Sequence, residues 1–458
     1  MKLTTALLSI ALGAASAAAA DRPNILFILA DDVGQEWLSC YGGQHKTPNL
    51  DSLAAGGVRF ETAWATPLCT PTRHELLTGR YPFRTGWTTH WDTPRWGGQY
   101  FDWKREVTFA RMLRDAGYAT AIAGKWQIND LRAQPDALER HGFDEHCVWP
   151  GVEAGNPQSE ARYFDPFMQI NGKRGIQKGR FGPDVCREFL IDFMKRNRSR
   201  PFLAYYPMLL AHSPMTKTPH NLDTGAKGAA LFPGMIDYID FEVGDLVKVL
   251  DDLKIRGNTI VFFAGDNGSP GLTVRMKGRE VTGGKSKLTE PGICMPFIVN
   301  GPGRILAGRT TDELIDFSDV FPTLAELTGS RLPKDVTLDG RSFVSVITDK
   351  PRTGPARAWI YSQYGPARVI RDKRYKLYSD GRFYDLQMDP GERFDLADSD
   401  NPDVIASSQR LLKILKSLPP DAKLPFEPRK PPEPERKGRR ERTTETPMGE
   451  VKDPGDLR

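Results

Sequence analysis

The sequence predicts an α/β fold, with a large, doubly wound and mostly parallel sheet flanked by helices at residues 21–345, and a smaller antiparallel sheet with a helix at 355–418. Three observations lead to this prediction. Continuous apolar runs, typical of strands buried on both faces, alternate with helical segments in the first part. Charged or polar residues follow several of these runs directly. In the second part, short strand-like runs are closely spaced and divided by turns.

The first 20 residues have the layout of a cleaved secretory signal. Lys2 precedes an apolar run at 6–12 and a stretch of small residues at 14–20. Such a segment is too short to span a bilayer and remain there, although an N-terminal membrane anchor is the alternative. We therefore expect an exported protein, periplasmic or secreted, that begins near Asp21 and has no membrane span.

Composition narrows the classes of partner. The formal net charge of +5 is small for 458 residues, so a nucleic-acid-binding surface is not indicated. The five cysteines contain no C-x-x-C pair and are too few for a disulfide scaffold. Export would permit disulfides, but the sequence leaves the pairing open among Cys40, Cys147, Cys186 and Cys294. It also assigns no oligomeric state.

The stretch at 65–86 places a cysteine at the start of a helix. Pro71 suits a first helical turn and Gly79 suits the residue after the last turn. Free N–H groups at such a start favour an anion, and Arg73 can lie on the same side of the helix as Cys69. Taken alone, this is a reactive thiol near a basic residue, or a buried inert cysteine.

Four predicted strands end beside residues with polar side chains. The strands and these residues are 24–30 with Asp31 and Asp32, 118–123 with Lys125, 202–206 with His212, and 260–264 with Asp266 and Asn267. Turn-capping aspartates are the alternative for the first pair taken alone. Because ligands bind beyond the carboxyl ends of strands in doubly wound sheets, we expect one site that contains all of these residues.

The oxygen atoms of this set suit a hard cation. The carboxylates of Asp31, Asp32 and Asp266 and the amide oxygen of Asn267 have no cluster of histidines or thiolates beside them. This composition favours Ca²⁺ or Mg²⁺ over zinc. The basic residues nearby suit an anionic group that bridges to the metal.

The motifs at these positions resemble those of the sulfatase family. C-T-P-T-R at 69–73, followed by L-L-T-G-R at 76–80, is similar to the sulfatase signature. The other matching segments are N-I-L-F-I-L-A-D-D, G-K-W, A-H-S-P, F-F-A-G-D-N-G and G-G-K-S-K-L-T-E. The resemblance implies a sulfatase catalytic domain of the alkaline-phosphatase-like superfamily at residues 21–345.

The resemblance also implies a modified residue and a metal. A formylglycine-generating enzyme would convert Cys69 to Cα-formylglycine, whose hydrate is the nucleophile in this family. Calcium, less readily magnesium, would be the metal. The implied metal ligands are Asp31, Asp32, residue 69, Asp266 and Asn267.

Basic residues take the remaining implied roles. Arg73, Lys125 and Lys285 would compensate the charge of the sulfate group. Lys125, His212 and Lys285 would bind substrate, with His212 or Lys285 at the departing alcohol. Lys287 competes with Lys285 for this position, and the one that is not used would be a surface charge.

Two segments depart from the family pattern. Sulfatases usually carry G-K-W-H, but Gln127 stands in the place of the histidine, and an amide cannot take a proton near neutral pH. The release of sulfate, in which Gln127 would take part, is therefore in question. We expect His74 to be a histidine on the helix surface, with a role as the substitute as the alternative. E-P-G-I-C-M-P at 290–296 lacks the basic residue of the family's E-G-G-x-R-x-P.

The segment at 87–103 is dense in aromatic residues and suggests the substrate class. Aromatic rings stack on sugar faces, so a sulfated glycan or small molecule is the expected substrate, with core packing as the alternative role of these rings. Two other functions remain open: a phosphate or phosphonate ester hydrolase of the same superfamily, and a non-catalytic protein that binds sulfated glycans, which Gln127 would explain.

The C-terminal part is predicted to form an α+β subdomain at 355–418. Its segments R-Y-K-L-Y and Y-D-L-Q-M-D-P-G-E are similar to the C-terminal region of sulfatases. The expected strands are 358–363, 367–371, 375–379 and 383–386, and the expected helix is 404–418, with Ile405, Leu411, Leu412 and Leu415 facing inward. The charged, proline-rich tail at 419–458 is expected to be disordered.

Overall fold

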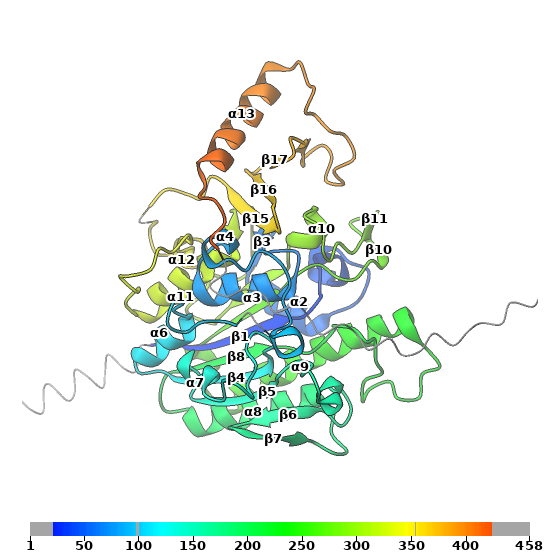
Figure 1. Cartoon of the computed structure of the whole chain (residues 1–458), viewed down its shortest axis with the longest axis vertical. Helices are drawn as coiled ribbons and strands as arrows, with labels where there is room; N and C mark the ends of the chain where they lie inside the picture. The colour runs from blue at the N-terminus through cyan, green and yellow to red at the C-terminus, as the bar shows by residue number, and fades with distance from the viewer. Residues whose placement is uncertain (1–21, 98–99, 353, 424–458) are drawn as a thin grey trace, which may run out of the picture.

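The computed structural model describes residues 22–97, 100–352 and 354–423. Within these residues, the centre of the molecule is a ten-stranded sheet in the order β13-β2-β12-β9-β1-β8-β4-β5-β6-β7 (Figure 1). The strands are β1 (Asn24–Ala30), β2 (Gly57–Phe60), β4 (Ala119–Lys125), β5 (Glu145–Trp149), β6 (Phe167–Ile170), β7 (Lys173–Ile176), β8 (Phe202–Pro207), β9 (Thr259–Gly265), β12 (Phe297–Asn300) and β13 (Arg309–Thr311).

The middle of this sheet is parallel. Strands β9, β1, β8, β4 and β5 run in one direction, whereas β12 and β6 pair antiparallel with β9 and β5 at the two sides. The prediction of a large, mostly parallel sheet is confirmed. The apolar runs form its central strands because both faces are covered, as the complete burial of β1 and β9 shows.

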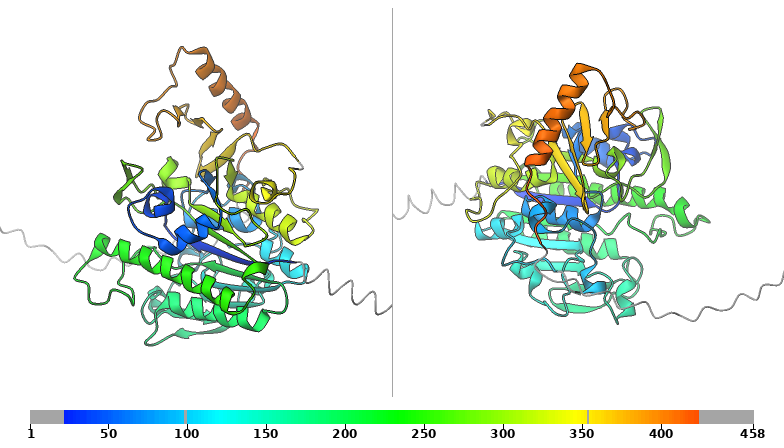
Figure 2. Two further views of the ribbon diagram at one scale, coloured as in Figure 1. Left: turned by 180° about the vertical axis from the view of Figure 1, so that it is seen from behind. Right: turned by 45° about the horizontal axis from the view of Figure 1, so that its top comes forward.

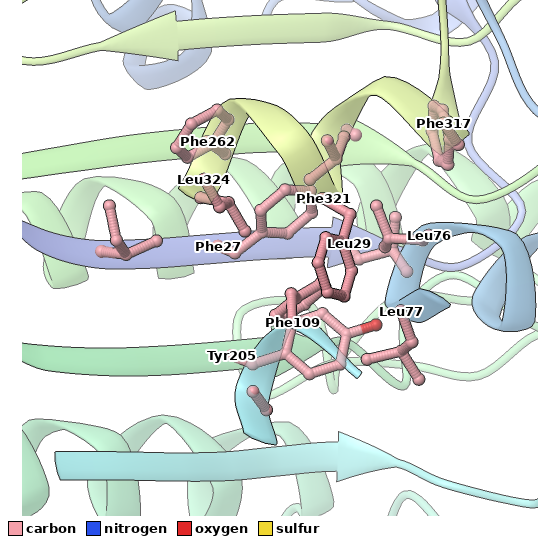
Figure 3. Packing of buried hydrophobic residues seen from close by; sticks show 14 of the residues in the cluster. Phe27, Leu29, Leu76, Leu77, Phe109, Tyr205, Phe262, Phe317, Phe321 and Leu324 are labelled. Atoms are coloured by element: carbon pink, nitrogen blue, oxygen red, sulfur yellow. The ribbon is translucent and has the colours of Figure 1, made fainter. Parts of the chain in front are cut away.

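Helices cover both faces of the sheet. One face carries α3 (Cys69–Thr78), α6 (Phe109–Asp115), α11 (Val320–Thr328) and α12 (Val344–Ile347), and the other carries α2 (Pro48–Ala55), α8 (Gly182–Asn197) and α9 (Phe232–Asp252). Figure 3 shows the first layer, where Phe27 stacks on Phe262 at a ring distance of 5.3 Å. Burying one such side chain contributes about 1.5–3 kcal/mol.

Short elements complete the large domain. They are β3 (Ala63–Trp64), β14 (Ile315–Asp316), β10 (Thr273–Met276), β11 (Arg279–Thr282), α4 (Pro82–Thr85), α5 (Thr93–Trp96), α7 (Ala137–Arg140), α10 (Glu290–Ile293), and the 3₁₀ helices η1 (Gln35–Trp37), η2 (Ser39–Tyr41), η3 (Pro157–Glu160), η4 (Gly228–Leu231), η5 (Arg256–Asn258) and η6 (Phe317–Asp319). All five cysteines are free thiols in this structure.

A second, antiparallel sheet follows, as predicted. It consists of β15 (Ile360–Tyr364), β16 (Ala367–Arg371), β17 (Tyr375–Tyr378) and β18 (Phe383–Asp385), and α13 (Pro402–Ser417) packs across it (Figure 2). The prediction that Ile405 faces inward is wrong, because its side chain is 40% exposed. Val404 packs on this core instead, since it precedes the buried Leu411 and Leu415 on the same helical stripe.

Buried ion pairs and a backbone bond join the small sheet to the large domain. Lys376 of β17 is fully buried and pairs with Glu290 of α10 at 3.1 Å and with Glu392 at 3.0 Å. At the tip of the β15–β16 hairpin, the Gly365 N–H donates to the carbonyl oxygen of Thr88 at 2.7 Å. The small sheet therefore anchors two segments of the large domain, the loop at Thr88 and the segment that leads into α10 at Glu290.

The two ends of the chain lie outside the described residues. This applies to the predicted signal at 1–20 and, from residue 424 onward, to the predicted disordered tail. Within the described part, none of the helices has the length and apolar character needed to cross a membrane.

A buried histidine in this fold predicts acid sensitivity. His141 stacks on Phe101 at 4.0 Å, and its Nε2 donates to the Phe101 carbonyl oxygen at 3.2 Å. Burial lowers the pKa of His141 to about 3. Since its pKa in the unfolded chain is about 6.5, it contributes stability above that pH, and this contribution is lost as the pH falls towards 3.

The variant His141→Gln should therefore lose less stability on acidification. Glutamine keeps a donor for the carbonyl oxygen but does not titrate, so the pH dependence should weaken by up to about 1.4 kcal/mol per pH unit below pH 6.5. Denaturant unfolding at pH 7 and at pH 4.5 measures this difference. Equal losses in the native protein and the variant would contradict the assignment.

Candidate active site

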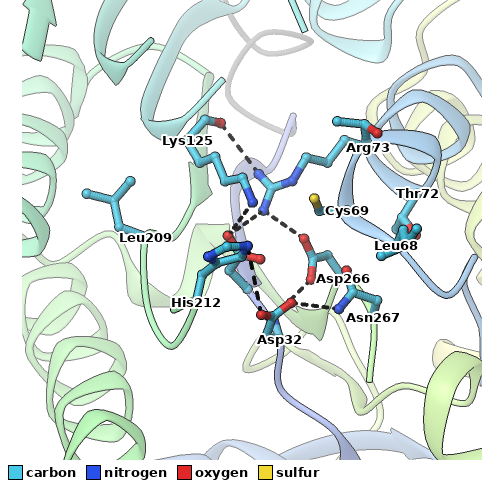
Figure 4. A network of polar contacts seen from close by, with 12 residues as sticks. Asp32, Leu68, Cys69, Thr72, Arg73, Lys125, Leu209, His212, Asp266 and Asn267 are labelled. Atoms are coloured by element: carbon cyan, nitrogen blue, oxygen red, sulfur yellow. Dashed lines mark hydrogen bonds and ion pairs between the residues drawn. The ribbon is translucent and has the colours of Figure 1, made fainter. Parts of the chain in front are cut away.

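The carboxyl ends of four adjacent strands bring the predicted polar residues together. In the sheet order β9-β1-β8-β4, Asp266 and Asn267 follow β9, Asp31 and Asp32 follow β1, and Lys125 is the last residue of β4. His212 lies beyond the end of β8 and reaches the same place (Figure 4).

Helix α3 brings Cys69 and Arg73 to the site. The helix begins at Cys69, as its sequence predicts, and ends before Gly79, which has a φ of +67°. A side chain at residue 79 would be strained at this φ, and its Cβ would lie 2.7 Å from Phe321. Cys69 is only 2% exposed and lies between Arg73 and Asp266 in Figure 4.

Three carboxylates and three cations pair within the site. Arg73 Nη2 lies 2.8 Å from Asp266 Oδ2, and Lys125 Nζ lies 2.7 Å from Asp31 Oδ2. The third pair joins Lys285 Nζ to Asp32 Oδ2 at 2.5 Å. Because the carboxylates are buried, each would be costly without its cation. The three pairs balance in charge, so a divalent cation would give the site a net positive charge that suits an anionic substrate.

The pKa values of the two most buried carboxylates diverge. Burial raises the pKa of Asp31, but Lys125, His212 and Arg73 together bring it well below its usual range. Burial and the charge of Asp31 raise the pKa of Asp266 well above its usual range, although Arg73 opposes this. A cation bound between the two carboxylates would remove their repulsion and favour the ionised form of both.

The buried oxygen atoms fit a hard cation. Among the described residues, Asp31 Oδ1 and Asn267 Oδ1 are buried and have no hydrogen-bond partner. The Asn267 amide nitrogen donates to Asp32 Oδ1 at 2.8 Å, which leaves the amide oxygen available as a ligand. Ligand atoms of Asp31, Asp32 and His212 also lie within 4.8 Å of one another. A hard cation prefers the oxygen atoms to the imidazole.

His212 is neutral at physiological pH. Burial and the nearby charge of Lys125 lower its pKa to about 4. Its Nε2 lies 4.0 Å from Asp32 Oδ2, and its Nδ1 lies 2.7 Å from the Ser213 carbonyl oxygen and 3.1 Å from Arg162 Nη1.

Two residues at this site were not predicted from the sequence. His90 Nδ1 lies 3.7 Å from Cys69 Sγ, and burial and the charge of Lys125 lower the pKa of this histidine to about 4. Arg162 stacks on the Trp149 ring at 4.1 Å and contacts His212. Neither residue belongs to a motif, and the position of His90 within the aromatic segment 87–103 was its only signal.

The structure places three residues whose roles the sequence left open. Gln127 is buried and hydrogen-bonds to Asp92. His74 is buried and stacks on Trp87 at 3.7 Å, so the prediction of a helix-surface histidine is wrong, and its nitrogens have no hydrogen-bond partner among the described residues. Lys287 is exposed, whereas Lys285 reaches Asp32.

The aromatic residues of segment 87–103 lie in both predicted environments: Trp87 packs in the core, and others lie near residue 69. Trp87 is buried in the core beside α3, which is the core-packing alternative. Trp91 and Trp96 are half-buried and pack against each other, with ring centres 5.6 Å apart. The Trp96 ring also lies 5.5 Å from His90, which contacts Cys69.

Comparisons with known proteins agree with this geometry. The sulfatase family model matches residues 23–330, and the model of the C-terminal region of N-sulphoglucosamine sulphohydrolase matches residues 284–418. The chain is 33% identical to N-acetylgalactosamine-6-sulfatase of Canis lupus familiaris, covering 74% of this chain and 70% of the relative. It is 32% identical to arylsulfatase A of Bos taurus, covering 84% and 85%.

A solved structure shows the same fold. The crystal structure of the PsFucS1 sulfatase from Pseudoalteromonas sp. superposes with a TM-score of 0.70 at 21% identity, covering 93% of this chain and 96% of that one. The fold and these relatives define a sulfuric ester hydrolase. The chain belongs to the sulfatase family.

Proposed function

We propose that this chain is an exported sulfatase that hydrolyses sulfate esters of a carbohydrate, with formylglycine at residue 69 and a divalent cation. The observation that carries the proposal is the position of Cys69 at the first residue of α3, beside the three ion pairs of Arg73, Lys125 and Lys285. In our assignment, residues 21–345 form the catalytic domain and 355–418 the C-terminal subdomain.

The cation would be Ca²⁺, with Mg²⁺ as the second choice, because the available donors are oxygen atoms. Asp31, Asp32, Asp266 and Asn267 would hold it together with residue 69. When present, the formylglycine hydrate supplies a nucleophilic hydroxyl and the cation lowers its pKa. The unpartnered oxygen atoms of Asp31 and Asn267 support this assignment.

The side chains of the site would bind and neutralise the sulfate group. Arg73, Lys125 and Lys285 would stabilise the charge that develops on the sulfate oxygens. Lys125, His212 and Lys285 would bind the substrate. Lys285, or His212, would donate a hydrogen bond to the departing alcohol oxygen or stabilise it. Gln127, which hydrogen-bonds to Asp92, would take part in the release of sulfate.

The substrate class is proposed from two observations. The half-buried Trp91 lies on the loop that carries His90, the half-buried Trp96 is the last residue of α5, and aromatic rings suit sugar faces. A relative that matches most of this chain is named N-acetylgalactosamine-6-sulfatase. Export to the periplasm or the medium is supported by the signal-like residues 1–20.

The test is conversion of Cys69. We expect protein made together with a formylglycine-generating enzyme to carry an aldehyde at residue 69, seen by peptide mass spectrometry as loss of the thiol. Hydrolysis of 4-nitrophenyl sulfate should rise in proportion to the converted fraction and should be absent in Cys69→Ala. Full activity of a protein with an unmodified thiol would end the proposal. Faster hydrolysis of 4-nitrophenyl phosphate would favour the phosphatase alternative.

A further inference from the structure

His90 reaches the side chain of residue 69 from a separate loop. This loop joins α4 to α5 and returns to the first turn of α3. There, His90 Nδ1 lies 3.7 Å from Cys69 Sγ and 3.3 Å from Thr70 Oγ1. His90 is thus an imidazole in direct contact with the side chain that the proposed function makes the nucleophile.

The hydrogen bonds of Thr70 orient this imidazole. The Trp91 N–H donates to Thr70 Oγ1 at 3.0 Å, so the threonine oxygen is an acceptor in that contact. The threonine hydroxyl can donate its own hydrogen to His90 Nδ1 at 3.3 Å, and we assign this direction to the contact. With this assignment Nδ1 is an acceptor, and the ring hydrogen of neutral His90 is placed on Nε2. The lone pair of Nδ1 faces residues 69 and 70.

Other bases near residue 69 are already engaged. Asp266 Oδ2 accepts from Arg73 at 2.8 Å, and its Oδ1 accepts from the Asp32 N–H at 3.1 Å. Asp31 Oδ2 accepts from Lys125 at 2.7 Å, and its unpartnered Oδ1 is the oxygen that we assign to the cation. Gln127 is bound to Asp92, and its amide takes no proton near neutral pH.

We infer that His90 is a catalytic residue that takes the proton from residue 69 when sulfate is released. The inference rests on the proposed function. The hydroxyl of residue 69 that carries no sulfate gives its proton to Nδ1, and its oxygen forms the C=O bond of the aldehyde. The bond between that carbon and the sulfate oxygen breaks, and sulfate leaves with the electron pair. The imidazolium then passes its proton to water, and water adds to the aldehyde.

Two His90 variants and a control separate proton transfer from positioning. His90→Phe removes the acceptor, whereas His90→Asn places an oxygen near the position of Nδ1 that accepts a hydrogen bond but no proton. Thr89→Val is the matched control, because Thr89 is the exposed neighbour in the same loop. All four proteins are converted at residue 69, checked for equal thermal stability, and mixed rapidly with 4-nitrophenyl sulfate.

We expect both His90 variants to lose about 10²-fold in kcat, the usual contribution of a positioned base. The initial burst of nitrophenol should remain, and intact-protein mass spectrometry should show covalently added sulfate in both variants during turnover. Thr89→Val should behave as the native protein. Recovery of kcat in His90→Asn, an unchanged kcat in His90→Phe, or loss of the burst without added sulfate would each overturn the inference.

A second measurement needs no turnover. In protein labelled with ¹⁵N-histidine, Cys69→Ser places a hydroxyl at residue 69 and Cys69→Ala removes it. The His90 Nδ1 resonance should be that of an unprotonated acceptor and should shift between the two variants. A protonated Nδ1, or no shift, would overturn the inference even if the proposed function holds. A native protein that is converted at residue 69 but inactive on sulfate esters would instead refute the proposed function.

Discussion

Asp266→Ala protein should lose its divalent cation and its turnover together. Removing this carboxylate takes one ligand from the cation and leaves the buried Arg73 with Asp31 alone, at 3.6 Å, in place of Asp266 at 2.8 Å. We expect kcat/KM for 4-nitrophenyl sulfate to fall by at least about 10³-fold, which corresponds to about 4 kcal/mol of transition-state stabilisation. Metal content by mass spectrometry should fall from one cation per chain to below about one tenth.

Two further variants support this experiment. Asp266→Asn keeps the shape of the side chain and a partner for Arg73, so it should fold as the native protein while binding the cation weakly. Asp237→Ala removes a carboxylate on α9 that is 58% exposed, and should keep full metal content and turnover. Native metal content and native turnover in Asp266→Ala would refute the metal assignment.

Lys376→Met should cause the largest loss of stability. Lys376 is fully buried and is the ion-pair partner of both Glu290 and Glu392. Methionine fills similar space but leaves Glu392 without its ion pair and Glu290 with Arg371 alone, at 2.8 Å. Breaking a buried pair in this way costs about 3–5 kcal/mol.

Denaturant unfolding at pH 7 measures this loss. Lys373→Met is the matched control, since Lys373 is 46% exposed and its ion pair with Asp312 lies at the surface. That variant should lose at most about 1 kcal/mol. A loss of similar size in both variants would show that the buried cluster does not hold the small sheet.

The main features of the fold could be predicted from sequence because they follow from local patterns. The buried run of β1 and its two aspartates show a strand that ends at a polar site. A parallel sheet then requires Asp31, Lys125 and Asp266 to lie at the same edge, as the structure has them. The start of α3 at Cys69 was likewise readable from Pro71 and Gly79.

Other features depend on how distant segments pack. His90 reaches Cys69 only because its loop returns to the first turn of α3, and no pattern in the sequence specifies that return. The amphipathic pattern around α13 predicted Ile405 in the core, but Val404 packs there instead. The burial of His74 follows from Trp87, which folds over α3 from beyond the motif.

The contacts of the small sheet set an order in which the site can be completed during biosynthesis. The ribosome makes the residues of the large domain first, including the loops that carry His90 and Lys285. Both loops have contacts within the large domain, but each gains a further anchor once the hairpin tip at Gly365 and the buried Lys376 have been synthesised. A nascent chain that ends before residue 360 therefore contains Cys69 but lacks these contacts of the small sheet. Synthesis of the last strands then completes the support of the two loops.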